Sequence, residues 1–143
     1  MSALPSAGGS TGSGSYSTSP AMFNGAAVAM RTLIDSLRRE ARSYAVSLTE
    51  YVHRDFSLID VTAPQATKGH ALAWRAEQLG LSRDEVMAVG DNFNDLDMLE
   101  YAGTPVVMAN AVEGLKRESW HATRHQDDAG LAHAIRTFAL GGR

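Results

Sequence analysis

The clearest pattern along the chain is a short apolar run that is followed at once by acidic and amide residues. Residues 86–89 are all apolar, Gly90 follows, and polar residues then recur until Met98. We interpret this stretch as a short buried strand, a tight glycine turn and the first turn of a helix. Wholly apolar strands are typical of parallel sheets, which bind ligands beyond the carboxyl ends of their strands. Asp91 and Asp95 are therefore expected at a ligand-binding edge.

The residues on either side of this stretch predict alternating helices and strands. Thr67 is expected to cap a helix over residues 68–79, which Gly80 ends. Further elements are predicted as a helix over 95–102, a buried strand over 105–109, a helix over 110–118 that Asn110 opens, and an edge strand over 120–123. A last helix is predicted to be capped by Asp127 or Asp128 and to turn Leu131, Ile135 and Phe138 inward. This alternation predicts βαβ units and a parallel sheet.

The first half of the chain has a different pattern. Residues 1–20 are rich in Ser and Gly, and we expect a flexible tail because such a segment buries little apolar surface. Apolar residues at helical spacing then predict a helix over 26–42, whose basic carboxyl end suits the helix dipole. Two strands are predicted over 44–52 and 56–61, joined by a turn at 53–55.

Charge is unevenly distributed around the predicted glycine turn. No Lys or Arg occurs between Arg83 and Lys116, whereas seven acidic residues do. Like charges four residues apart on a helix cost roughly 0.2–0.5 kcal/mol per pair, so Asp91 and Asp95 favour a bound cation. Carboxylate oxygens suit Mg²⁺, which proteins usually hold with one or two carboxylates, waters and a phosphate. The alternative is that these polar residues only form the turn and cap the helix, as Asp and Asn commonly do.

Lys68 stands at an unusual place for a cation. It lies in the first turn of a predicted helix, where the helix dipole disfavours positive charge by roughly 0.3–1 kcal/mol. This position is explained if the ammonium group faces an anion. The alternative is an exposed lysine that water screens.

Composition narrows the class of protein. The 143 residues suffice for one modest domain, and the net charge of -3 with a pI near 5.9 argues against a nucleic-acid partner. Without cysteine the chain has neither disulfides nor thiolate metal sites. No apolar run approaches the length of a membrane span, and the amino terminus lacks the features of a secretory signal. We therefore expect a cytoplasmic protein with no membrane partner.

Several segments in the second half of the chain match one family, in the same order. They are residues 67–72 (TKGHAL), 79–86 (LGLSRDEV), 88–99 (AVGDNFNDLDML), 102–111 (AGTPVVMANA) and 127–131 (DDAGL). On these motifs the chain resembles the carboxyl-terminal half of haloacid dehalogenase (HAD) superfamily phosphatases of the Cof type, subfamily IIB. Residues 26–66 resemble, more weakly, the last helix and strands of the cap domain that precedes the lysine in this family.

The resemblance implies an α/β fold. It consists of a partial Rossmann-like (HAD) parallel sheet flanked by helices, preceded by a remnant of an α+β cap. The implied division is a low-complexity Ser/Gly-rich tail over 1–21, a cap-domain remnant over 22–66 and the carboxyl-terminal half of an HAD-like core over 67–143.

The resemblance also implies a chemistry. Such enzymes are Mg²⁺-dependent phosphatases of small phosphorylated metabolites, and they form an aspartyl-phosphate that water then hydrolyses. By position, Lys68 is the phosphate-binding lysine and Asp91 is a metal ligand. Asp95 supports the metal directly or through water, and Asn94 hydrogen-bonds the phosphate or the nucleophile. A lysine and a metal ion both stabilise phosphoryl transfer electrostatically, which agrees with these roles.

The chain departs from the family pattern at the nucleophile. The family's nucleophile lies in a DxDGT motif, which this sequence does not contain; residues 33–36 (LIDS) and 58–62 (LIDVT) are the nearest segments. Ala109 also replaces a glycine that is usual before Asn110. The sequence thus predicts half of an active site and no nucleophile within it, and we expect little activity from this chain alone.

Two functional hypotheses remain open at this point. The first is a phosphatase that is truncated or is completed by another polypeptide. The second is a catalytically inactive remnant or interaction module, in which missing strands leave an apolar sheet edge that binds a complementing chain or a second copy. The phosphorylation domain of cation-pumping ATPases has a motif that resembles residues 90–95, but such pumps need membrane helices.

Overall fold

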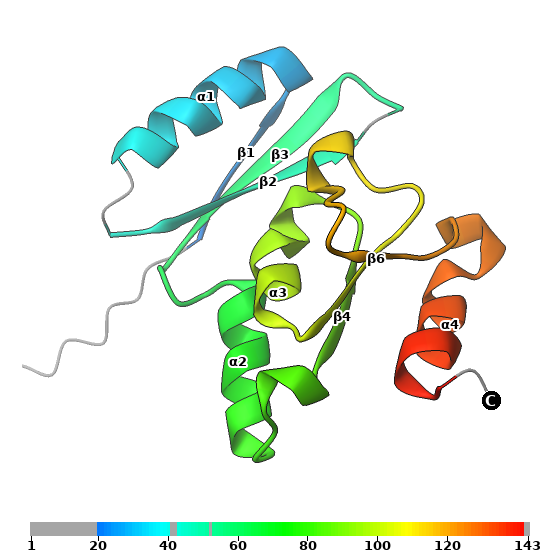
Figure 1. The fold of residues 1–143 in the computed structure, drawn as a ribbon. Coiled ribbons are helices and arrows are strands. Elements are labelled where there is room, and N and C mark those ends of the chain that lie inside the picture. The colour runs from blue at the N-terminus through cyan, green and yellow to red at the C-terminus, as the bar shows by residue number, and fades with distance from the viewer. Residues whose placement is uncertain (1–19, 41–42, 52, 142–143) are drawn as a thin grey trace, which may run out of the picture.

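The computed structural model describes residues 20–40, 43–51 and 53–141 of the chain, and these residues form two sheets flanked by helices (Figure 1). Most of the predicted amino-terminal tail, residues 1–19, lies outside the described residues, as do the last two residues of the predicted helix over 26–42. The predicted α/β class is confirmed.

The amino-terminal sheet is antiparallel, with strand order β1-β3-β2 (Figure 1). Its strands are β1 (Ala21–Gly25), β2 (Ala45–Tyr51) and β3 (Phe56–Thr62), and helix α1 (Ala27–Glu40) packs on one face. Leu48 and Ile59 are opposite each other in the β2–β3 register and bury against Ile34 of α1. The predicted helix over 26–42 and the predicted strands over 44–52 and 56–61 are confirmed within the described residues, whereas β1 was not predicted. Strand β2 lies at an edge of this sheet.

The second sheet is parallel, with strand order β4-β5-β6. Its strands are β4 (Met87–Gly90), β5 (Thr104–Val107) and β6 (His121–Ala122), and its helices are α2 (Lys68–Gln78) and α3 (Leu96–Tyr101), with the 3-10 turn η2 (Phe93–Asp95) before α3. Gly90 pairs with Val107 in the register. The carboxyl ends of β4 and β5 therefore lie at one edge of the sheet, as the sequence predicts.

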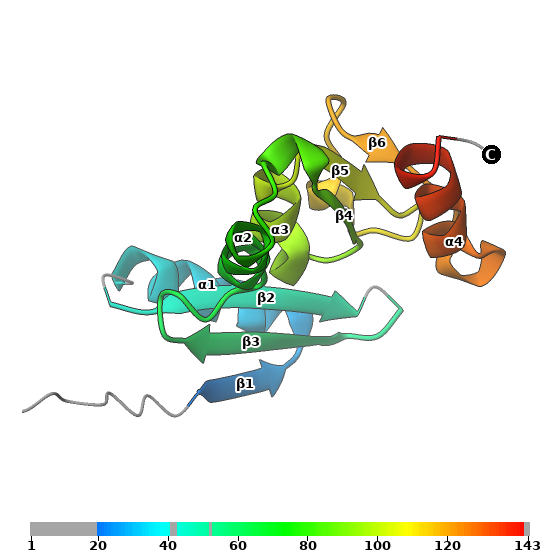
Figure 2. The same ribbon diagram turned by 90° about the horizontal axis from the view of Figure 1, so that it is seen from below.

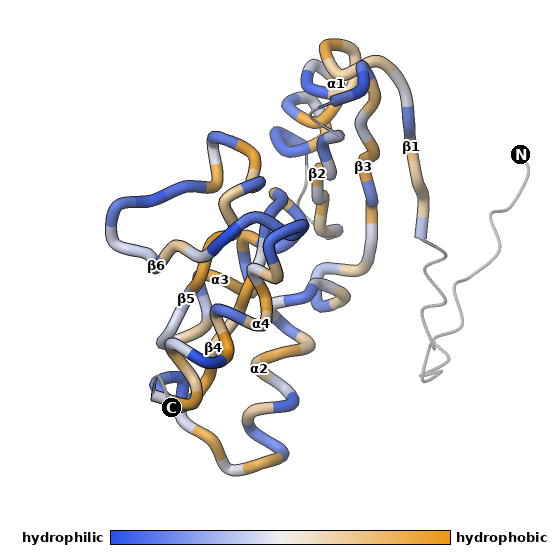
Figure 3. The backbone as a smooth tube through the Cα atoms, turned by 90° about the vertical axis from the view of Figure 1, so that its right-hand side faces the viewer, coloured by the Kyte–Doolittle hydropathy of each residue, from blue (hydrophilic) through white to orange (hydrophobic). Residues whose placement is uncertain are grey.

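Each sheet has an apolar core of its own. The core of the parallel sheet contains the fully buried Leu99 and Leu115, while that of the antiparallel sheet centres on Ile59. Figure 3 shows apolar colour where β4, β5 and α3 meet, and a hydrophilic loop before β6. The predicted domain boundary at residue 66 stays a prediction. Within the described residues, no helix combines the length and apolarity that crossing a membrane requires.

Local signals in the sequence account for the ends of α2 and the start of β4. The Thr67 hydroxyl accepts a hydrogen bond of 3.2 Å from the backbone N–H of His70, and Gly80 ends the helix with φ of +66°. Ser82 and Glu85 then form a capping box around the 3-10 turn η1 (Arg83–Glu85). Because the backbone N–H and hydroxyl of Ser82 donate to Glu85, the pKa of that carboxyl is lowered.

The predicted helix over 110–118 is wrong. That segment contains only the 3-10 turn η3 (Glu113–Leu115). The side chain of Asn110 bonds Asp91 and the backbone N–H of Gln126, and the backbone N–H of Val112 donates to Asp91 O at 3.0 Å. These long-range hydrogen bonds hold the segment against the edge of the parallel sheet. A continuous helix would direct the same backbone N–H groups to carbonyls within the segment instead.

The last helix is present, but its cap and its inward face differ from the prediction. Helix α4 (Gly130–Ala134) continues into a π-helical turn η5 (Ile135–Ala139). Ala129, and not Asp127 or Asp128, occupies the N-cap position of α4, with no side-chain cap hydrogen bond. Leu131 and Ile135 are 53% and 39% exposed. The buried residues of α4 are Gly130 and Ala134 instead, because backbone of the preceding loop packs against Gly130 too closely for any side chain. Phe138, half-buried, stacks on His121.

Replacing Gly69 by alanine tests the close contact between α2 and α3. A Cβ at this position would lie 2.8 Å from the backbone carbonyl carbon of Asp97 and 2.7 Å from its Oδ2, so the start of α2 would have to shift. We expect Gly69→Ala to lower the free energy of unfolding by about 1–3 kcal/mol, although alanine favours helices. Denaturant unfolding measures this. The exposed Ala71→Ser is the control, and equal stability of both variants would contradict the packing.

Candidate functional site

The parallel sheet and the antiparallel sheet border a cleft of about 630 Å³ at the carboxyl ends of the parallel strands. The structure brings all four predicted site residues to this cleft: Lys68, Asp91, Asn94 and Asp95. Figure 2 shows why the antiparallel sheet takes part, since β2 is the strand that runs beside α2 and α3. The grouping of these side chains is thus observed, while their individual roles stay predictions.

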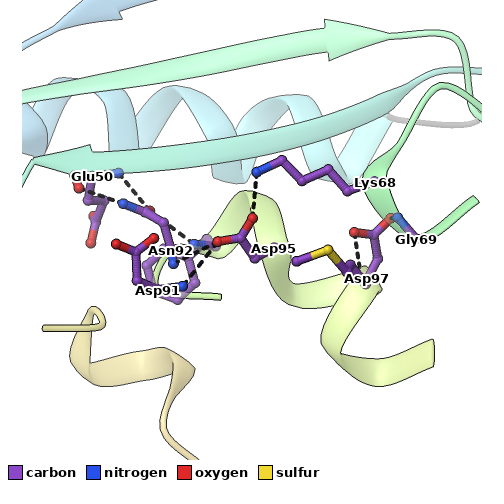
Figure 4. Close-up of polar contacts among 9 residues, drawn as sticks. Glu50, Lys68, Gly69, Asp91, Asn92, Asp95 and Asp97 are labelled. Atoms are coloured by element: carbon purple, nitrogen blue, oxygen red, sulfur yellow. Dashed lines mark hydrogen bonds and ion pairs between the residues drawn. The ribbon is translucent and has the colours of Figure 1, made fainter. Parts of the chain in front are cut away.

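Asp95 is the most connected side chain of the site (Figure 4). One carboxylate oxygen accepts a hydrogen bond of 2.5 Å from the Lys68 ammonium group. The other accepts from the backbone N–H groups of Asp91 at 3.1 Å and Asn92 at 3.3 Å. The Asp95 side chain is only 8% exposed, whereas that of Lys68 is 50% exposed. The buried carboxylate thus fixes the turn after β4 and leaves the ammonium group accessible from the cleft.

Asp91 has a different environment. The Asn110 side-chain amide donates a hydrogen bond of 2.9 Å to one oxygen of the Asp91 carboxylate, and the Asn110 carbonyl accepts from the backbone N–H of Gln126 at 3.0 Å. Sequence analysis treated Asn110 only as the start of a helix. Its place just beyond the carboxyl end of β5, the neighbour of β4, was the signal that could have found it.

Asp97 positions the start of α2, and sequence analysis missed it. Its Oδ2 accepts a hydrogen bond of 2.9 Å from the backbone N–H of Gly69, directly after Lys68 (Figure 4). Two acidic residues therefore fix the start of α2. Asp95, directly before α3, binds the Lys68 side chain, and Asp97, within α3, binds the backbone N–H of Gly69. The unfavourable place of Lys68 in a first helical turn is explained by its bond to Asp95.

Asn92 joins the turn after β4 to the edge of the antiparallel sheet. Its side-chain amide accepts a hydrogen bond of 2.9 Å from the backbone N–H of Glu50 and donates one of 2.7 Å to the backbone carbonyl of the same residue (Figure 4). The amide thus occupies the place of a neighbouring strand at the open edge of β2. The Glu50 side chain in turn accepts from Arg31 of α1 at 3.0 Å.

The described residues offer few protein ligands for a divalent cation. Among residues 20–40, 43–51 and 53–141, no group of three or more His, Cys, Asp or Glu side chains could hold a metal ion. Both oxygens of Asp95 already accept hydrogen bonds, and Asp91 offers the remaining carboxylate of the turn. A single carboxylate oxygen fits an ion that keeps several waters and binds a phosphate, which is the usual habit of Mg²⁺.

The family model of haloacid dehalogenase-like hydrolases matches residues 17–135. Phosphatase YwpJ of Bacillus subtilis is 40% identical over 77 residues, which is 54% of this chain and 27% of that protein. A phosphoglycolate phosphatase of Methanothermobacter thermautotrophicus is 34% identical over 104 residues, 73% of this chain and 45% of that protein. The solved structure of a haloacid dehalogenase-like hydrolase from B. subtilis has 30% identity and a TM-score of 0.64, covering 82% of this chain and 40% of its own.

These comparisons confirm the resemblance that the motifs indicate. The chain spans less than half the length of these relatives.

Replacing Asp95 by asparagine tests whether this carboxylate holds the site together. An amide nitrogen would face either the Lys68 ammonium group or two backbone N–H groups, so donors would oppose donors. We expect Asp95→Asn to lower the free energy of unfolding by about 1–3 kcal/mol in denaturant titrations. Asp35→Asn, exposed on α1, is the matched control and should change it by less than about 0.5 kcal/mol. Equal effects would show that Asp95 is only a turn residue.

Proposed function

The chain belongs to the haloacid dehalogenase-like hydrolase family, and we propose that it provides the phosphate-binding and metal-binding half of a Mg²⁺-dependent phosphatase site for small phosphate monoesters. The observation that carries this proposal is the Asp95 carboxylate. It accepts hydrogen bonds from both the Lys68 ammonium group and the backbone of Asp91, and so holds a cationic and an anionic group at one cleft. The names of the relatives YwpJ and phosphoglycolate phosphatase support the phosphatase activity.

Lys68 would bind the phosphoryl group. Its ammonium group has three donors, of which one is directed at Asp95, and half of the side chain is exposed. The remaining donors can reach phosphoryl oxygens in the cleft, and Asn94 offers a further amide there. Because phosphoryl transfer is promoted mainly by positioning and by electrostatic stabilisation, a fixed cation at this place lowers the barrier.

Asp91 would hold Mg²⁺, and Asn110 orients its carboxylate for that task. When bound, Mg²⁺ offsets the negative charge that accumulates between the carboxylates and the phosphate. Asp95 acts as a positioning residue, since its oxygens are hydrogen-bonded to Lys68 and to the backbone of the turn. This assignment refines the predicted role of Asp95 to indirect support of the metal.

The nucleophile would come from another segment. The sequence has no DxDGT motif, and β4, which ends directly before Asp91, pairs with a strand on one side only among the described residues. A strand that pairs in parallel with the other side of β4 would carry its carboxyl end to the cleft. We place the missing aspartate on such a strand, whether in a longer form of this chain or in another polypeptide.

The open edge of β4 also favours a second candidate function, an inactive interaction module. An unpaired strand edge exposes backbone donors and acceptors to another chain. Size-exclusion chromatography tests whether this edge pairs with a second copy of the chain. A stable monomer at high concentration would contradict that form of the interaction module.

Calorimetric titration of phosphate in the presence of Mg²⁺ tests the binding half of the proposal. We expect Lys68→Met and Asp91→Asn to weaken phosphate binding at least about tenfold, because the first removes the cation that pairs with the anion and the second removes the carboxylate that would hold Mg²⁺. Asp128→Asn, an exposed substitution outside the cleft, is the control. Unchanged binding in the first two variants, or no phosphate binding by the folded wild type, would contradict the proposal.

Hydrolysis of para-nitrophenyl phosphate tests the missing nucleophile. With Mg²⁺ present, we expect little turnover by this chain alone, since the sequence lacks the DxDGT motif that carries the family's nucleophile. Robust hydrolysis that Asp91→Ala abolishes would show instead that the 143 residues contain a complete active site.

A further inference from the structure

The charged side chains that line the cleft divide into those with a partner and those without one. The Glu50 carboxylate accepts from Arg31 at 3.0 Å, and Lys68 donates to Asp95 at 2.5 Å. Arg54 lines the same cleft. Within the described part of the chain, its guanidinium has no carboxylate at ion-pair distance and no side-chain hydrogen bond.

The backbone that carries Arg54 is held in place. Arg54 lies in the turn between β2 and β3, where its N–H donates to Tyr51 O at 2.9 Å and its carbonyl accepts from the N–H of Phe56 at 2.8 Å. Four residues before it, Glu50 is bound on both backbone groups by the Asn92 amide. Asn92 directly follows Asp91, the proposed metal ligand. The contact between Asn92 and Glu50 therefore attaches the end of β2 to the turn after β4.

We propose that Arg54 binds a second anionic group of the substrate, so that the site selects phosphate monoesters which also carry a carboxylate. This inference rests on the proposed function, because it places the phosphoryl group at Lys68 and Asp91. A guanidinium binds a carboxylate with two parallel hydrogen bonds. A carboxylate suits this cleft better than a second, doubly charged phosphate, because the acidic Glu50 and Asp127 also line it.

A matched pair of ligands tests the assignment. 3-Phosphoglycerate and glycerol 3-phosphate share a three-carbon skeleton and a phosphate, but only the first has a carboxylate. Binding of each to the full chain in the presence of Mg²⁺ is followed by NMR titration. We expect the carboxylate to improve the dissociation constant about tenfold, since charge-assisted bidentate hydrogen bonds are strong. Arg54→Gln should remove this advantage, whereas Arg39→Gln, an exposed arginine of α1 outside the cleft, should preserve it.

The possible outcomes separate this inference from the proposed function. Binding of both ligands with equal affinity overturns the role of Arg54 and leaves the phosphate site standing. An advantage that survives in Arg54→Gln overturns the assignment to this residue. If neither ligand binds, the phosphate site itself is refuted and the inference is refuted with it. Arg54 is exposed, so its substitution is not expected to prevent folding.

Discussion

The site depends on one buried carboxylate. Burying a charged group is costly unless charge and hydrogen bonds compensate it, and Asp95 is compensated by Lys68 and by two backbone N–H groups of the turn after β4. Lys68 lies 27 residues away in the sequence. The hydrogen bonds of Asp95 therefore stabilise the fold and also fix the distance between the Lys68 ammonium group and Asp91. The proposed phosphate binding would depend on that distance.

A second constraint joins the two sheets at this turn. Asn92 bonds the edge of β2, and Phe93 packs against the apolar cores of both sheets. One short segment thus carries the proposed metal ligand and also determines which part of the antiparallel sheet borders the cleft. The β2–β3 hairpin, with Arg54 in its turn, is directed to the site by this attachment and not by the parallel sheet itself.

The residues that bind a phosphoryl group and the nucleophile that attacks it need not lie in one segment of an enzyme. In the proposed site, a lysine would bind the anion and an aspartate would hold the divalent cation, with several amides around the same cleft. Covalent catalysis further requires a nucleophile, and the proposed strand that would bring one pairs with the edge of β4 that has no partner among the described residues.

The sequence by itself determined the features that short-range signals encode: the cap of α2 at Thr67, its end at Gly80, the apolar strand before Gly90, and the motifs that place Lys68 and Asp91 at one sheet edge. Only the tertiary structure decided the features whose partners are distant. Asn92 hydrogen-bonds Glu50, which is 42 residues away in the sequence. Asn110 hydrogen-bonds Asp91, 19 residues away, and the segment after Asn110 does not form the helix that its sequence predicts. The inward face of α4 was decided likewise, because helical spacing does not reveal which surface a helix packs on.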